Sequence, residues 1–284
     1  MFSEHTLYIV ATPIGNRNDF SFRAIETLQQ VDRIYAEDTR HSLPLLRHHG
    51  IDTRTFALHE HNEASRIALI LEFLGDGGSA ALITDAGTPL ISDPGFQLVR
   101  ACQRAGVRVM PIPGPCALTA ALSVGGLPTD RFQFVGFPPS KTSARQTWLQ
   151  PLAELSHTLV VYESPHRIVE CLQDIVAVMG ELRPMTLARE LTKKFETVLH
   201  GTASEVLLAV QSDSNQQRGE FVLVLGGAAT LPGEDVVVAS EGLDKTIRVL
   251  LEHLPVKTVA RCASELCGVT RKEAYNRALL LQGR

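Results

Sequence analysis

The feature that most constrains the fold is an alternation of short apolar runs with longer amphipathic stretches in the first part of the chain. One of these stretches carries Ile67, Ile70, Leu71 and Leu74 at the spacing of a single helix face. Strands that alternate with helices in this way form a mostly parallel sheet with helices on both faces. The runs expected to be strands cover residues 7–12, 33–37, 55–59, 80–85 and 107–112.

A second series of short apolar runs follows in the middle of the chain. Residues 185–190 and 196–201 are separated by only a few residues, which is too short for a crossover helix. We therefore expect an antiparallel pair there, in an α/β domain that differs from the first. The runs of this series are 132–137, 158–163, 185–190, 196–201 and 220–226.

Local chemistry indicates where several helices begin. Ser92 and Ser164 each stand near a proline that suits a first helical turn, Pro94 and Pro165, so we expect helices to start there. Thr202 with Glu205 has the spacing of a capping box.

The last part of the chain is expected to be a small helical module after a linker. Residues 228–242 are rich in glycine, proline and acidic residues, which is typical of a linker. Gly268 is a predicted helix stop, and Thr270 with Glu273 forms a second capping-box pattern. The predicted helices cover residues 243–254, 257–267 and 271–282, and the last two resemble a helix-turn-helix.

Together these patterns predict an α/β protein in three parts. They are a parallel-sheet N-terminal domain at 1–115, a mixed-sheet second domain at 116–230 and a C-terminal helical module at 240–284.

Charge is distributed unevenly along the chain. The whole protein has a net charge of −4, but from residue 257 onward six basic residues face two acidic ones, a local balance of +4. A basic tail on an acidic body indicates an anionic partner such as nucleic acid, although a solvated helix surface has the same pattern. The basic residues are Lys257, Arg261, Arg271, Lys272, Arg277 and Arg284.

Signals for export, membrane insertion or metal binding are missing from the sequence. No apolar run approaches the roughly 20 residues that cross a bilayer, and residues 1–6 lack the basic start of a signal peptide. The five cysteines form no C-x-x-C pair, and the histidines between His41 and His61 fall on separate expected elements. We therefore expect a cytoplasmic location, reduced thiols and no metal.

Four turn-rich segments follow the strands of the first domain, and they indicate a ligand site. In a parallel sheet, ligands bind beyond the carboxyl ends of the strands, where rigid loops present backbone groups. No P-loop is possible because the chain has no Gly-Lys dipeptide, and no G-x-G-x-x-G follows the first strand, which disfavours an ordinary Rossmann enzyme. The four segments are ATPIGN (11–16), EDTR (37–40), TDAGTPLISDPG (84–95) and PIPGPCALTAAL (111–122).

These segments, with VYESPHR (161–167), ARELTKKFE (188–196) and GEFVLVLGG (219–227), resemble the tetrapyrrole methylase superfamily. Within it, the chain is similar to the enzymes that methylate the ribose 2′-oxygen of a cytidine in 16S ribosomal RNA of the small subunit. The resemblance implies a two-domain tetrapyrrole-methylase-like fold, S-adenosylmethionine in the cleft between the domains, and a homodimer. Relatives that modify tetrapyrroles have G-x-G-P where residues 11–15 read ATPIG, which argues against a porphyrin-type substrate.

The resemblance also implies which residues bind the cofactor, matched segment by segment. They are Ile14, Asp85, Thr88, Cys116, Ala117, Tyr162 and Leu191.

The chemistry of methyl transfer suggests further roles for polar residues at the strand ends. A sulfonium methyl donor leaves the protein mainly to align the attacking oxygen, with a general base to take its proton. We predict Asp38 as that base, with Glu37 as the next choice. Cationic side chains bind phosphate, so the predicted RNA contacts are Arg40, Lys193 and Lys194 near the cleft, and Lys257, Arg261, Arg271, Lys272 and Arg277 in the tail.

Two alternatives to an RNA ribose methyltransferase remain open from the sequence. One keeps the cofactor and changes the acceptor to a tetrapyrrole or a protein side chain. The other is a non-catalytic RNA-binding factor whose cleft no longer functions. The basic tail favours RNA over the first of these.

Overall fold

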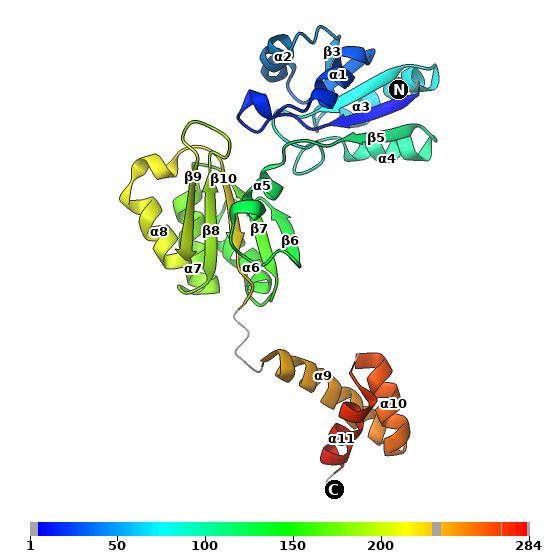
Figure 1. Ribbon diagram of the computed structural model, residues 1–284, viewed down its shortest axis with the longest axis vertical. Coiled ribbons are helices and arrows are strands. Elements are labelled where there is room, and N and C mark those ends of the chain that lie inside the picture. Colours follow the sequence, from blue (N-terminus) through cyan, green and yellow to red (C-terminus); the bar gives the residue numbers. More distant parts are fainter. Residues whose placement is uncertain (1–4, 229–233, 268, 283–284) are drawn as a thin grey trace. The chain divides into compact units, whose positions relative to one another are not determined.

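The computed structural model describes residues 5–228, 234–267 and 269–282 (Figure 1). It divides into two compact units, Met1–Ala228 and Ala229–Arg284. The first unit contains both α/β sheets, and the second contains the C-terminal helices. The predicted domain boundary near residue 115 lies inside the first unit and stays a prediction, although the change from one sheet to the other does fall between β5 and β6.

The first sheet is parallel throughout and has the strand order β3-β2-β4-β1-β5. All five strands predicted for this part are therefore confirmed. They are β1 (Thr6–Val10), β2 (Arg33–Ala36), β3 (Thr55–Ala57), β4 (Ser79–Ile83) and β5 (Arg108–Ile112).

Helices cover both faces of this sheet. Neighbouring residues of a strand point to opposite faces, so each face has its own core. Tyr8 of β1 packs in the core under helices α1 (Phe22–Gln30) and α2 (Thr39–His48). Its neighbour Leu7 packs in the core under α3 (Glu63–Gly75) and α4 (Phe96–Arg104). Since all strands are parallel, their carboxyl ends and the loops after them lie at one edge of the sheet.

The second sheet is mixed and has the order β6-β7-β10-β8-β9. β6 is parallel to β7, and the other pairs are antiparallel, including the predicted pair β8–β9. The strands are β6 (Phe132–Gly136), β7 (Thr158–Glu163), β8 (Pro184–Arg189), β9 (Thr197–Thr202) and β10 (Phe221–Leu225).

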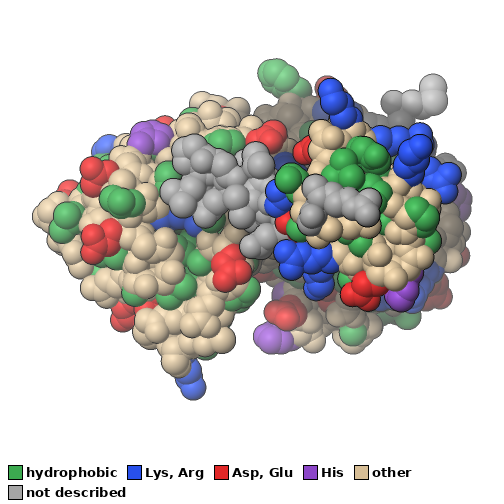
Figure 2. Space-filling model, turned by 90° about the horizontal axis from the view of Figure 1, so that it is seen from below, with side chains coloured by type: hydrophobic (Ala, Val, Ile, Leu, Met, Phe, Trp, Pro, Cys, Tyr) green, Lys and Arg blue, Asp and Glu red, His purple; other side chains and the backbone are tan. Residues whose placement is uncertain are grey.

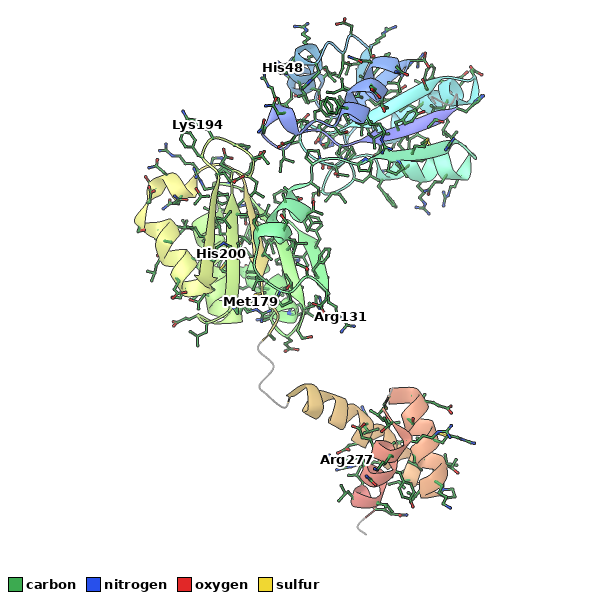
Figure 3. The ribbon with its side chains drawn as sticks, viewed as in Figure 1. His48, Arg131, Met179, Lys194, His200 and Arg277 are labelled. Carbon is green, nitrogen blue, oxygen red and sulfur yellow. The ribbon has the colours of Figure 1, made fainter. Side chains whose placement is uncertain are left out.

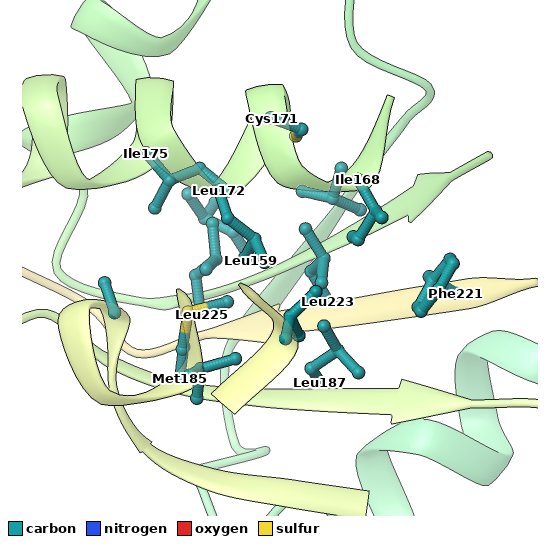
Figure 4. Packing of buried hydrophobic residues seen from close by; sticks show 14 of the residues in the cluster. Leu159, Ile168, Cys171, Leu172, Ile175, Met185, Leu187, Phe221, Leu223 and Leu225 are labelled. Atoms are coloured by element: carbon teal, nitrogen blue, oxygen red, sulfur yellow. The ribbon is translucent and has the colours of Figure 1, made fainter. Parts of the chain in front are cut away.

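The two faces of the second sheet have different partners. One face packs on α6 (Thr142–Ala153), α7 (Ile168–Met179) and α8 (Ala203–Ser212), and Leu159, Leu187 and Leu223 are central to that core (Figure 4). The other face contacts α5 (Ala117–Val124) and residues Ile14 and Leu191 from two loops. This second face therefore borders the region where the loops of the first sheet arrive.

The predicted helix starts have mixed outcomes. The capping box is confirmed, since Glu205 N donates to Thr202 Oγ1 at 3.3 Å and Thr202 N donates to Glu205 Oε2 at 2.8 Å. The starts at Ser92 and Ser164 are wrong. Helix α4 begins at Phe96, because residues 84–95 form a loop in which Ser92 has a positive φ of 69°. Helix α7 begins at Ile168, because the Ser164 hydroxyl accepts a hydrogen bond from Arg167 Nε instead of capping a helix.

The C-terminal unit is a three-helix module of α9 (Glu234–Leu251), α10 (Val256–Cys267) and α11 (Arg271–Leu281). Its core is built from Leu243 and Ile247 of α9 with small residues of the other two helices. Thr270 caps α11 by accepting from Glu273 N at 3.2 Å.

The predicted linker is wrong for residues 234–242, because α9 begins at Glu234. Residues 234–241 contain no glycine or proline, so the sequence has no helix breaker in this stretch. The rest of the predicted linker, residues 229–233, and the predicted stop at Gly268 lie outside the described residues. No helix within the described part of the chain has the length and apolar character needed to cross a membrane.

Candidate functional site

The loops after β1, β4 and β5 are joined to one another at the carboxyl edge of the first sheet. Thr12 N donates to Gly87 O at 2.8 Å, and Gly87 N donates back to Thr12 O at 3.0 Å. The Thr88 hydroxyl donates to Pro115 O at 3.0 Å. Gly87 has a φ of 93°, a conformation that disfavours any residue with a side chain. These bonds hold three of the four turn-rich segments as one rigid rim.

A cavity of about 480 Å³ opens at this rim and is bordered on its other side by β7 and β10 of the second sheet. The structure brings all seven predicted cofactor-binding residues together around it, and their role in binding stays a prediction. These residues are Ile14, Asp85, Thr88, Cys116, Ala117, Tyr162 and Leu191. We call this space the acidic cavity, because its lining includes five carboxylates and no lysine or arginine. The carboxylates are Glu37, Asp85, Asp93, Glu163 and Glu220.

Two of these carboxylates are joined by one buried hydroxyl. Thr84 Oγ1 lies 2.7 Å from Glu37 Oε2 and 2.7 Å from Asp93 Oδ1. A hydroxyl has one proton to donate, so both hydrogen bonds form together only when one carboxyl group is itself protonated. Burial, opposed by the Thr84 hydrogen bond and assisted by Glu37 and Asp85, raises the pKa of Asp93 to about 6. Asp93 is therefore the carboxyl group best placed to hold or release a proton near neutral pH.

The opposite wall of the acidic cavity is aromatic and apolar. Tyr162 packs edge-on against Phe134 and Phe137, with ring centroids 4.8 and 5.6 Å apart. Its hydroxyl accepts a hydrogen bond from Leu118 N at 3.0 Å, which ties β7 to the first turn of α5. Burial raises the pKa of Tyr162, so this side chain is a neutral structural support.

A second cavity, of about 420 Å³, adjoins the first and shares Ile14, Asp85, Ala86 and Glu220 with it. Its lining adds three cationic side chains and one histidine, which are Arg17, Arg40, Lys193 and His41. We call it the basic cavity. The two cavities thus form one continuous site with carboxylates on one side and cations on the other.

The two candidate bases lie in different places. Glu37 lines the acidic cavity, whereas Asp38 lines neither cavity. Asp38 caps α2 by accepting from Arg40 N at 2.9 Å, and it also binds the Arg40 guanidinium at 2.7 Å. Arg40 holds the pKa of Asp38 at about 2, well below the range in which a carboxylate takes up a proton near neutral pH.

The predicted RNA-contacting residues of the first unit also differ in their surroundings. Arg40 is 89% exposed at the mouth of the basic cavity. Lys193 Nζ lies 2.8 Å from both Glu190 Oε1 and Glu220 Oε2, so its charge is already balanced. Lys194 lies outside both cavities, in the loop between β8 and β9 (Figure 3), with Nζ 5.4 Å from the ring centroid of Phe195.

In the C-terminal unit, four of the five predicted RNA contacts are exposed, namely Lys257, Arg261, Arg271 and Lys272. Arg277 is different, because its guanidinium binds Asp244 through two hydrogen bonds, one of them 2.7 Å long. Over residues 229–284 the sequence contains eight basic and seven acidic residues, a net charge of only +1. Basic side chains are interspersed with acidic and hydrophobic ones on the face shown in Figure 2.

Sequence reasoning missed three carboxylates and one arginine of these cavities. Asp93 lies within a segment that was singled out, but its importance depends on burial beside Thr84. Glu163 and Glu220 come from the second sheet, and Arg17 follows the first turn-rich segment by one residue. The sequence could have indicated these residues only through their charge and their positions next to strand ends. Within the described residues, no group of three or more His, Cys, Asp or Glu side chains is placed to hold a metal ion.

Comparison with known proteins gives matches along the whole chain. Residues 6–207 match the model of the Tetrapyrrole (Corrin/Porphyrin) Methylases, and residues 237–282 match that of the RsmI C-terminal HTH domain. A protein of Xylella fastidiosa strain Temecula1 named ribosomal RNA small subunit methyltransferase I is 50% identical, with 97% of this chain and 99% of the relative covered. A protein of the same name from Escherichia coli O157:H7 is 47% identical, with 99% and 97% covered.

Two solved structures have the same fold at low sequence identity. A cobalt precorrin-4 methyltransferase superposes with a TM-score of 0.59 at 17% identity, covering 78% of this chain and 95% of that one. A diphthine synthase gives a TM-score of 0.59 at 16% identity, covering 78% and 90%. The predicted fold, a parallel-sheet domain followed by a mixed-sheet domain of the tetrapyrrole-methylase type, is confirmed.

Proposed function

Because the chain belongs to the tetrapyrrole methylase family, we propose that it uses S-adenosylmethionine to methylate the ribose 2′-oxygen of a cytidine in 16S ribosomal RNA of the small subunit. The family description supports methyl transfer as the reaction, and the names of the relatives support ribosomal RNA as the acceptor. The observation that carries the proposal is the acidic cavity, where seven residues expected to bind the cofactor border one space.

The chemistry of the acidic cavity fits S-adenosylmethionine. Its volume lies within the range of about 300–1,000 Å³ for small-molecule sites. Its carboxylates favour a sulfonium cation over a neutral or anionic ligand. The apolar wall with Phe137, Tyr162 and Leu191 suits a flat adenine ring, and the rigid loop from Asp85 to Thr88 offers backbone groups for polar atoms. When bound, S-adenosylmethionine supplies the activated methyl group.

The residues of the chain then have two tasks, which are alignment and proton removal. Alignment of the acceptor oxygen is worth about 7–11 kcal/mol in well-oriented reactions, and a general base adds roughly 10²- to 10⁴-fold. We propose that Glu37 and Asp93, joined by Thr84, accept the proton that the ribose hydroxyl loses. Asp38, the first choice from sequence, has its carboxylate occupied by Arg40 and the start of α2. We therefore assign it a structural role.

We propose that RNA is held by cations of both units. In the first unit these are Arg40 and Lys193 at the basic cavity, with Lys194 on the neighbouring loop. In the second they are Lys257, Arg261, Arg271 and Lys272 on α10 and α11. Arg277 supports the helices through Asp244. Because the second unit has a net charge of only +1, we infer that specific side chains, more than a general positive field, provide its contacts.

Tetrapyrrole and protein acceptors remain the competing enzyme functions. The solved structures of a cobalt precorrin-4 methyltransferase and a diphthine synthase share only the fold with this chain, at 16–17% identity. The relatives named for ribosomal RNA are 47–50% identical over nearly the whole chain. The homodimer implied by the resemblance stays a prediction, which light scattering on the purified protein will check.

The decisive experiment is transfer of a labelled methyl group from S-adenosylmethionine to small ribosomal subunits or to free RNA, followed by nucleoside analysis. We expect 2′-O-methylcytidine as the product. A methylated base would overturn the ribose assignment. No binding of S-adenosylmethionine at millimolar concentration in calorimetry would overturn every methyltransferase function and leave a non-catalytic RNA-binding factor.

A further inference from the structure

We infer that the basic cavity binds a phosphate group next to the acceptor ribose, and that Arg17 is the side chain that binds it. This inference rests on the proposed function and adds the site for the acceptor. The basic cavity lies next to the acidic cavity, because the two share the lining residues Ile14, Asp85, Ala86 and Glu220. A nucleotide held in the basic cavity therefore lies beside a methyl donor held in the acidic one.

Arg17 differs from the other cations of the basic cavity in having no ion pair within the described residues. Arg40 binds Asp38 at 2.7 Å, and Lys193 is shared between Glu190 and Glu220. The Arg17 side chain is exposed on the cavity wall and has no carboxylate partner in the described part of the chain. An unpaired guanidinium gives the cavity its excess positive charge, and its planar set of donors matches the geometry of phosphate oxygens.

The chain around Arg17 is fixed across the site, so the position of this arginine is defined. Asn16 N donates to Thr192 Oγ1 at 3.0 Å, which joins the loop after β1 to the loop after β8. The Asn16 side chain in turn accepts from Asn18 N at 3.0 Å and caps the short helix η1 (Arg17–Asp19). Gly15 lies so close to the same loop that a Cβ there would be 2.4 Å from Lys193 Cγ.

Arg40 is a second donor that an incoming phosphate can recruit. Its ion pair with Asp38 is 89% exposed on the arginine side, and exposed pairs contribute little because solvent screens them. A phosphate that replaces Asp38 as the partner therefore loses little binding energy. Lys193 is less available because two carboxylates already bind it. The expected order of importance for phosphate is therefore Arg17, then Arg40, then Lys193.

The test is a matched pair of substitutions in the full-length protein, Arg17→Gln and Arg108→Gln. Arg108 is also an exposed arginine, but it begins β5 and so lies at the amino edge of the sheet, away from both cavities. Initial rates of methyl transfer are measured against the concentration of small subunits at several salt concentrations. Calorimetry gives the affinity for S-adenosylmethionine, and thermal unfolding reports whether each variant is folded.

For Arg17→Gln we expect KM for the subunit to rise about tenfold, the effect of losing one charge-assisted hydrogen bond. We expect kcat and the affinity for S-adenosylmethionine to stay within about twofold. The slope of log(kcat/KM) against log[salt] should become shallower by about 0.7–0.9, the contribution of one phosphate contact. Arg17→Lys keeps the charge and should restore most of that slope, whereas Arg108→Gln should match the wild type.

Each outcome decides between the two proposals. If the wild type methylates subunits and Arg17→Gln behaves like Arg108→Gln, the phosphate site is wrong and the proposed function stands. If the wild type binds S-adenosylmethionine but transfers no methyl group to subunits or RNA, the proposed function fails and takes the phosphate site with it. If Arg17→Gln unfolds or no longer binds S-adenosylmethionine, Arg17→Lys decides. Lysine keeps the charge but not the planar set of donors, so a raised KM for subunits supports the phosphate contact and a wild-type KM contradicts it.

Discussion

The acidic and basic cavities are built from the same loops yet have opposite charge. The segment EDTR contributes Glu37 to the acidic cavity and Arg40 to the basic one, with Asp38 between them as the cap of α2. The loop after β1 contributes Ile14 to both cavities, and Arg17 only to the basic one. Acidic and basic side chains are therefore separated into the two cavities within a few residues of each strand end. One loop can therefore serve a cationic donor and an anionic acceptor together.

The largest expected effect concerns the proton acceptor of the acidic cavity. Asp93→Asn keeps a partner for the Thr84 hydroxyl but removes the carboxylate, so we expect kcat for methyl transfer to fall about 100-fold. The matched variant is Asp38→Asn, because asparagine also caps helices well. Single-turnover rates and calorimetry separate the chemical step from donor binding. A larger loss in Asp38→Asn than in Asp93→Asn would return the base to Asp38, as the sequence alone predicted.

The pH dependence of kcat should follow the ionisation of the same carboxylate, Asp93. Since Asp93 must be ionised to accept a proton and its pKa is raised to about 6, kcat should fall about tenfold per pH unit below that value. The contribution of Asp93 to the free energy of unfolding changes with pH in the opposite direction. A carboxyl group with a raised pKa in the folded state favours folding when it is protonated, and that contribution is lost as pH rises through about 6. A pH profile of Asp93→Asn that keeps the wild-type acid limb would contradict this assignment.

The C-terminal unit should affect binding of the RNA acceptor and not binding of S-adenosylmethionine. Removing residues 229–284 leaves the unit that contains both cavities, so we expect unchanged affinity for S-adenosylmethionine. Methyl transfer to subunits should drop at least about tenfold, because several phosphate contacts are lost together. Filter binding measures the affinity for RNA, and calorimetry measures the affinity for S-adenosylmethionine. Full activity of the shortened chain would remove the helical module from RNA binding.

The smallest expected effect concerns the close contact between Gly15 and the loop after β8, which borders both cavities. Gly15→Ala places a Cβ 2.9 Å from Thr192 Oγ1 and 3.2 Å from Leu191 O, and it must shift the loop after β8. We expect about threefold increases in both the Kd for S-adenosylmethionine and the KM for subunits. Gly75→Ala is the control, because Gly75 ends α3 with no neighbour within 4 Å. An effect confined to one constant would show that the cavities respond independently.

Much of the fold follows from pattern alone. Short runs of strand-forming residues predicted all ten strands. The signal is clearest for strands buried on both faces, such as β4 and β10, because such a strand is a short apolar run whatever its neighbours are. Local signals for helix starts were less dependable. The capping box of Thr202 and Glu205 was predicted correctly. Ser92 is instead in a loop where its φ is positive, and the Ser164 hydroxyl accepts a hydrogen bond from Arg167 Nε.

Sequence patterns were enough to predict the two kinds of sheet, the loops at the carboxyl edge and the family resemblance, because each depends on the order of residues along the chain. Which polar residues matter at the site depends on how the chain folds. Burial beside Thr84 raises the pKa of Asp93, and the pairing of Arg40 and Lys193 with carboxylates leaves Arg17 unpaired within the described chain. The burial of Asp93 and the Lys193–Glu220 ion pair depend on residues that are distant in the sequence, whereas the Arg40–Asp38 pair is local. The amino-acid types alone therefore do not specify them.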